Sequence, residues 1–131
     1  TICDYAGAGA LPKMTIGRSL RPLAEGRRVA NWREYVVGES FLGKGQVGVR
    51  DSRHKTILYC NGPVKAFDLK AAALEMKDLS ATAPGKAVIS KHKRYLRDYL
   101  SRIDLCERVD NKKPEPYKVY LDFYRTIREG A

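Results

Sequence analysis

The sequence is poor in the residues and segments that mark several protein classes. Its cysteines, Cys3, Cys60 and Cys106, are widely spaced and form no Cys-x-x-Cys pair, which argues against a disulfide framework. The only histidines, His54 and His92, lack metal-ligand spacing. No apolar run approaches the roughly 20 residues that cross a bilayer, and no secretory signal is visible. We therefore expect a protein of the cytoplasm, the nucleus or an organelle interior, not secreted, not inserted in a membrane, and without metal or cofactor.

Acidic residues are few compared with basic ones. The chain carries 25 Lys and Arg against 15 Asp and Glu, a formal net charge of +10 at pH 7. An excess of this size destabilises a compact chain by self-repulsion and indicates something about partners rather than fold. RNA, DNA, an anionic membrane surface or an acidic protein surface would each suit it.

Catalytic motifs are also missing. Residues 42–49, LGKGQVGV, resemble the glycine-rich loop of protein kinases, but the chain has no HRD-type catalytic loop and no DFG motif. A glycine turn between two strands explains the same residues. His92 falls on the apolar arc of a predicted helix, where a hydrogen-bonded, partly buried histidine is a better explanation than a catalyst. Because no spacing identifies a nucleophile with its base, we expect no enzyme.

The middle of the chain has the alternation typical of strands. Residues 33–37, 40–42 and 47–49 alternate polar and apolar side chains, and residues 56–60, TILYC, are the clearest strand. Asn-Gly-Pro at 61–63 has the composition of a tight turn. Three or four short antiparallel strands fit this spacing.

Three later segments have helical periodicity. Residues 68–79 can form a helix with Asp68 at its N-cap, and residues 89–106 can form one with Ser90 near its start. In the latter, aromatic and aliphatic residues occupy one arc and basic residues the opposite one. Residues 117–129 form a helix with a wider apolar face, suited to wedging between two elements or to contacting a partner.

Together these segments predict an α+β fold. A small antiparallel sheet over about residues 33–60 would be packed by two or three helices, all within a single domain of residues 31–131. Residues 1–30, rich in glycine and arginine, would precede it as an extended, flexible basic arm.

Basic clusters are the candidate binding residues, because phosphate contacts require only positive charge presented at the surface. Trp32 is expected in the core, with stacking on an unpaired base as the alternative; Tyr120 and Tyr124 are candidates for partner contact. The polyanion-binding candidates are Arg27, Arg28, Arg33, Arg50, Arg53, Lys55, Lys91, Lys93, Arg94 and Arg97.

The function predicted from these features is non-catalytic binding of nucleic acid, RNA before DNA, within a ribonucleoprotein or ribosome-like assembly. The alternative is a basic linker or assembly subunit that docks on acidic protein partners, as in an antenna complex. The wide apolar face of the last helix favours this alternative. The sequence leaves the identity of the partner and any base preference open.

Overall fold

A computed structural model describes residues 1–9, 17–40, 45–71, 74–102 and 115–129, with the side chains of the last helix described from Leu121 onward. The chain forms two compact units, residues 1–33 and 34–131, which are described separately.

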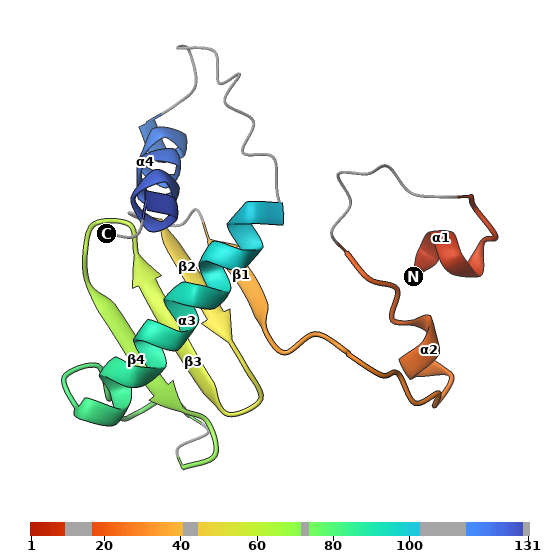
Figure 1. The fold of residues 1–131 in the computed structure, drawn as a ribbon, viewed down its shortest axis with the longest axis horizontal. Coiled ribbons are helices and arrows are strands. Elements are labelled where there is room, and N and C mark those ends of the chain that lie inside the picture. The colour runs from red at the N-terminus through yellow and green to blue at the C-terminus, as the bar shows by residue number, and fades with distance from the viewer. Residues whose placement is uncertain (10–16, 41–44, 72–73, 103–114, 130–131) are drawn as a thin grey trace. The chain divides into compact units, whose positions relative to one another are not determined.

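The second unit contains a four-stranded antiparallel sheet whose strands follow one another in chain order (Figure 1). Val49, Thr56 and Ala66 lie opposite one another on neighbouring strands, so their side chains share one face of the sheet, and all three are buried. The turn after β3 contains Gly62, whose φ of 116° favours glycine. The strands are β1 (Val36–Ser40), β2 (Gln46–Arg50), β3 (His54–Tyr59) and β4 (Val64–Asp68).

Helix α3 (Ala83–Arg102) runs across one face of this sheet, and α4 (Glu115–Glu129) packs against α3 (Figure 1). Their apolar side chains meet those of β2 and β3 in one core, which gives the helices a partner for their apolar stripes. None of the described helices is long and apolar enough to cross a membrane. The core consists of Val47, Val49, Leu58, Leu96, Leu100, Tyr124 and Ile127.

The start of α3 differs from the prediction. The helix begins at Ala83 rather than near Ser90, and its cap is Thr82, whose Oγ1 accepts a hydrogen bond from the backbone N–H of Gly85 at 3.1 Å. Pro84 belongs to the first turn, where its missing N–H costs no helical hydrogen bond. Pro84 and Gly85 both belong to the helix, so the prediction placed its start too late.

The helix predicted over residues 68–79 is wrong. Asp68 ends strand β4, and its Oδ1 accepts hydrogen bonds from the backbone N–H groups of Lys70 (3.0 Å) and Ala71 (3.2 Å), forming a turn. The chain then returns beside β4, where the N–H of Leu79 donates to the carbonyl oxygen of Ala66 at 2.8 Å. Met76, expected in the core, is 83% exposed. Residues 72–73 lie outside the described ranges.

The first unit has two short helices, α1 (Ile2–Tyr5) and α2 (Arg21–Ala24). Ser19 donates a hydrogen bond to Asp4 at 2.7 Å, and the N–H of Leu20 donates to the hydroxyl of Thr1 at 2.8 Å. These contacts join the residues around α1 to the segment just before α2. The extended basic arm is therefore not confirmed, whereas the predicted α+β class, with a small antiparallel sheet and helices, is confirmed.

Candidate functional site

Asp51 forms a buried anionic centre in the turn between β2 and β3. Its Oδ1 accepts hydrogen bonds from the backbone N–H groups of Arg53 (2.8 Å) and His54 (2.6 Å). An aspartate followed by free N–H groups two and three residues later is the usual composition of such a turn. The turn therefore fixes one carboxylate oxygen and directs the other toward α3.

Two side chains of α3 contact the second oxygen of Asp51. Lys91 Nζ lies 2.8 Å from Oδ2 and His92 Nε2 lies 3.3 Å from it. The other ring nitrogen of His92, Nδ1, is 2.8 Å from the hydroxyl of Thr56. Because an ionised carboxylate only accepts, Nε2 carries the proton of the neutral imidazole and Nδ1 accepts from Thr56.

The charges of this cluster follow from its contacts. Burial alone would raise the pKa of Asp51, but the hydrogen bonds from Lys91 and from backbone N–H groups outweigh burial and hold that pKa well below its usual range. The hydrogen bond to Asp51 raises the pKa of Lys91, and burial lowers the pKa of His92. His92 and Thr56 are fully buried. The cluster therefore joins α3 to the sheet and is out of reach of a substrate.

A second cluster of polar side chains connects Tyr35, the residue before β1, to Tyr95, Asp98 and Arg102 of α3. The rings of Tyr35 and Tyr95 stack with centroids 4.4 Å apart. The Tyr35 hydroxyl donates to Asp98 and accepts from Arg102, and Arg102 also pairs with Asp98 at 2.7 Å. Burial, together with the hydrogen bond to Asp98, raises the pKa of Tyr35 to about 12. Tyr35 is therefore a neutral phenol near pH 7, and Arg102 is neutralised within the fold.

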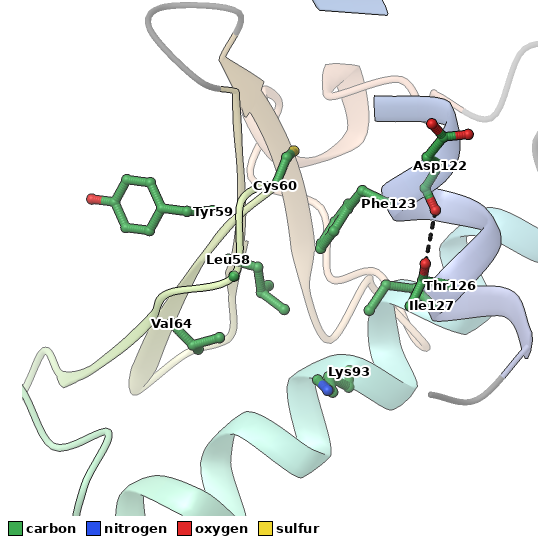
Figure 2. A pocket seen from close by; sticks show the side chains of 10 residues that line it. Leu58, Tyr59, Cys60, Val64, Lys93, Asp122, Phe123, Thr126 and Ile127 are labelled. Atoms are coloured by element: carbon green, nitrogen blue, oxygen red, sulfur yellow. Dashed lines mark hydrogen bonds between the residues drawn. The ribbon is translucent and has the colours of Figure 1, made fainter. Parts of the chain in front are cut away.

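A cavity of about 470 Å³ lies between the β3–β4 hairpin, α3 and α4 (Figure 2). Figure 2 shows Phe123 directed toward the hairpin and Tyr59 directed away from Phe123 on the other side of the strand. Burial raises the pKa of Cys60, so this side chain is a thiol near neutral pH. The cavity walls are mostly apolar, and the polar side chains around it are Lys93, Asp122 and Thr126.

Several of the predicted basic residues form ion pairs with acidic side chains of the chain itself. Lys91 is bound to Asp51, and Arg53 pairs with Asp68 through two nitrogens, at 3.0 and 2.7 Å. The remaining predicted residues found in ion pairs are Lys55, at 2.9 Å from Glu75, and Arg27, at 2.6 Å from Glu25.

The other predicted basic residues lie in three places. Arg50 is exposed at the end of β2, opposite Lys55. Arg28 is exposed in the first unit, where Arg33 lies 5.4 Å from the centroid of the half-buried Trp32 ring. The predicted residues Lys93, Arg94 and Arg97 lie on α3 together with Lys86, which was not predicted; Lys93 is half-buried and the other three are exposed. We call these four cations the α3 ridge.

The predicted aromatic contacts have separate environments. Trp32 also has Arg18 5.8 Å from its ring centroid, so cations of its own unit lie close to its ring. Tyr124 is 5% exposed and belongs to the core. The side chain of Tyr120 lies outside the described residues.

Sequence reasoning missed the partnership of Asp51 with Thr56 and His92. The turn composition beginning at Asp51 was a usable signal, but its contacts with α3 join residues about 40 positions apart. Within the described ranges, no group of three or more His, Cys, Asp and Glu side chains is placed to hold a metal ion.

Comparison with known proteins shows a likeness to sulfatases. The chain is 30% identical over 108 residues to a Delta 4,5-hexuronate-2-O-sulfatase of Bacteroides thetaiotaomicron, a match that covers 78% of this chain and 22% of that protein. No model of a protein family matches the chain.

Solved structures agree with this likeness. A putative sulfatase from the same organism has a TM-score of 0.65 at 30% identity, covering 78% of this chain and 23% of its own. A 2-O GAG sulfatase has a TM-score of 0.64 at 30% identity, with the same coverage. A phosphonate monoester hydrolase of Agrobacterium radiobacter, at 24% identity and a TM-score of 0.62 over 79% of this chain and 24% of its own, shares the fold.

These findings overturn the functional prediction. The relatives are hydrolases, so both the non-catalytic nucleic-acid-binding component and the alternative linker subunit are wrong, as is the expectation of no enzyme. Net positive charge suits many polyanions and does not identify one of them. The chain resembles sulfatases over most of its own length and spans about a fifth of the length of the curated relative it matches.

Proposed function

We propose that this chain is part of a hydrolase that removes sulfate from an acidic saccharide. The observation that carries the proposal is the 30% identity over 108 residues to a sulfatase, supported by the TM-score of 0.65 to a second one. The reaction would consume water and convert a sulfate ester into a free hydroxyl group and inorganic sulfate.

In this proposal the described part of the chain is a module that supports the reactive centre rather than forming it. The chain spans about a fifth of its curated relative, so most of such an enzyme lies outside the matched segment. The Asp51–Thr56–His92 cluster superficially resembles a catalytic triad, but His92 and Thr56 have no exposed surface. A group that touches the reacting atoms must be reachable by substrate, so we assign this cluster to the stability of the module.

The charge of the chain is consistent with an anionic substrate. A net charge of +10 over 131 residues attracts sulfated and carboxylated saccharides and accelerates their encounter with the protein. The same charge led to the prediction of RNA, because both polymers present closely spaced anions.

The experiment uses the full-length protein that carries this sequence. Purified protein is incubated with an unsaturated uronyl disaccharide sulfated at the uronate 2-O position, and released inorganic sulfate is measured by ion chromatography. The control substrate is the isomer sulfated only at the hexosamine 6-O position. We expect sulfate release from at least one isomer, with the 2-O isomer preferred.

A folded protein that releases sulfate from neither isomer would contradict the proposal. Hydrolysis of a phenyl phosphonate monoester without any sulfate release would contradict it as well, because that result would assign the module to the other class of hydrolase that shares its fold.

A further inference from the structure

The α3 ridge forms a continuous line along α3, with Lys86, Arg94 and Arg97 exposed and Lys93 half-buried beside the cavity. Positions 86, 93 and 97 fall within a narrow arc at 100° per residue, and position 94 extends that arc to one side. With a rise of 1.5 Å per residue, Lys86 and Arg97 are separated by about 16 Å along the axis. Exposed Ser90 lies between them, so no bulky side chain interrupts the line.

The cations of the α3 ridge differ from those on the flank of α3 that contacts Asp51 and Tyr35. There, Lys91 pairs with Asp51 and Arg102 pairs with Asp98. None of the ion pairs formed within the described part of the chain involves Lys86, Lys93, Arg94 or Arg97. Their charge therefore remains available to a partner.

One member of the α3 ridge, Lys93, also lines the cavity between the β3–β4 hairpin and α4 (Figure 2). Phe123 provides an apolar wall, and Asp122 and Thr126 provide polar groups. A sugar ring presents C–H groups on its faces and hydroxyls on its edge, so this recess has complementary chemistry for one saccharide unit. The row of cations thus continues into a recess suited to a sugar.

We propose that the α3 ridge is a non-catalytic docking surface for a sulfated polysaccharide chain; this inference rests on the proposed function. Sulfate groups spaced along the polymer pair with the row of Lys and Arg, and arginine adds two-nitrogen contacts with sulfate oxygens. The relatives include a 2-O GAG sulfatase, which supports a sulfated glycan as the polyanion. A polysaccharide held on this surface stays attached to the enzyme, which raises the effective concentration of its sulfate esters.

The outer side of α3 fits a sulfated glycan better than RNA. Recognition of single-stranded RNA uses exposed aromatic side chains on which bases stack. The other exposed residues between Lys86 and Arg97 are the small Ala87 and Ser90, and the nearby aromatic Tyr95 is already stacked on Tyr35. Among the described residues, bases would find an aromatic wall at Phe123 in the recess but none along the row itself, whereas sulfates need only the cations.

The test measures binding of a labelled heparin octasaccharide to the 131-residue chain. The ridge variant is Lys93→Glu with Arg94→Glu and Arg97→Glu. The matched control is Lys65→Glu with Lys70→Glu and Lys77→Glu, an identical change in net charge at exposed positions on β4 and the segment after it. Circular dichroism checks folding, and a milder variant, Arg94→Gln with Arg97→Gln, replaces the triple reversal if that protein is unfolded.

We expect the ridge variant to lose about tenfold or more in affinity and the control to lose at most about threefold, since only long-range attraction changes there. The slope of log affinity against log salt should fall by about one for each contact removed, as it does for phosphate contacts. An unsulfated hyaluronan octasaccharide should bind at least about tenfold more weakly than heparin, because its charge density is lower.

Equal losses in both variants would overturn the proposal, because binding would then report net charge alone. Competition by poly(U) as effective as that by heparin would also overturn it. Failure here is distinguishable from failure of the proposed function: an enzyme that desulfates the disaccharide while this chain ignores heparin would refute the docking surface only. An enzyme that releases no sulfate would refute the proposed function whatever the chain binds.

Discussion

At the residue scale, Asp51 joins the β2–β3 turn to α3. Its two oxygens receive hydrogen bonds from the β2–β3 turn and from two side chains of α3. A buried carboxylate is stable only when such donors replace its lost hydration. Thr56 extends the same network, since its hydroxyl completes the partners of His92.

Replacement of Thr56 by valine should lower the free energy of unfolding by about 1–3 kcal/mol, because the shape is kept while His92 Nδ1 loses its partner in a buried site. Urea denaturation of the 131-residue chain measures this change. The matched control is Thr126→Val, which removes an exposed hydroxyl on α4 and should alter stability by at most about 0.5 kcal/mol. Equal effects of the two substitutions would show that the buried network contributes nothing specific.

The same cluster predicts a pH dependence. Because the pKa of His92 is lowered from 6.5 in the folded state, the unfolded chain binds its proton first, and stability should fall as pH drops below about 6.5. The pKa of Asp51 is lowered from 3.8, so its contribution is present above that value and is lost at more acidic pH.

Unfolding free energies measured from neutral to acid pH test this dependence. Asp51→Asn should flatten the most acidic part of the curve, whereas Asp122→Asn, which changes an exposed carboxylate, should leave its shape intact. Parallel curves for wild type and Asp51→Asn would rule out the assigned role of Asp51.

At the element scale, the first turn of α3 fits closely against the segment before it. A Cβ added at Gly85 would lie 1.8 Å from the carbonyl oxygen of Leu79, a backbone atom. Alanine normally stabilises a helix by up to about 1 kcal/mol relative to glycine. Here the clash requires the backbone to move, and overpacking of this kind costs about 1–3 kcal/mol.

We therefore expect Gly85→Ala to destabilise the chain in thermal or urea unfolding, against its helix propensity. Ser90→Ala, at an exposed position of the same helix, is the control and should be neutral or stabilising by a few tenths of a kcal/mol. A stabilised Gly85→Ala variant would mean that α3 does not start against Leu79.

The sequence predicted correctly those elements whose local pattern of polar and apolar residues favours the same structure as their packing in the folded chain. The strand over residues 56–60 and the apolar arc containing Leu96 and Leu100 are of this kind. Residues 68–79 are not: the alanine-rich pattern favours a helix, but pairing of β4 with β3 completes the sheet and requires a turn at Asp68. Tertiary pairing overrides propensity there, and no local signal reports it.

The candidate site was less predictable than the fold. A sequence shows which residues are basic but not which of them have acidic partners: Lys55 and Glu75 are 20 residues apart and lie within 2.9 Å. Only the folded chain shows which cations have acidic partners. For this reason the prediction grouped Arg53 and Lys55, which are paired, with Arg94 and Arg97, which form no ion pair among the described residues.

At the scale of the whole molecule, the net charge concerns the kind of partner, whereas the fold concerns the class of protein. The charge of +10 would suit an anionic partner, and the sheet with its crossing helix resembles part of the sulfatases. The charge alone does not distinguish a sulfated saccharide from RNA. The likeness to sulfatases favours the saccharide, and it is the basis of the proposed function.

The central claim is tested most directly by incubating the full-length protein with a sulfated saccharide and an RNA in the same reaction. A 2-O-sulfated uronyl disaccharide and a fluorescent RNA oligonucleotide are added together, while inorganic sulfate and RNA anisotropy are followed in parallel. The account predicts that sulfate is released until the ester is consumed and that the RNA stays free. Intact sulfate ester in the presence of bound RNA would contradict it.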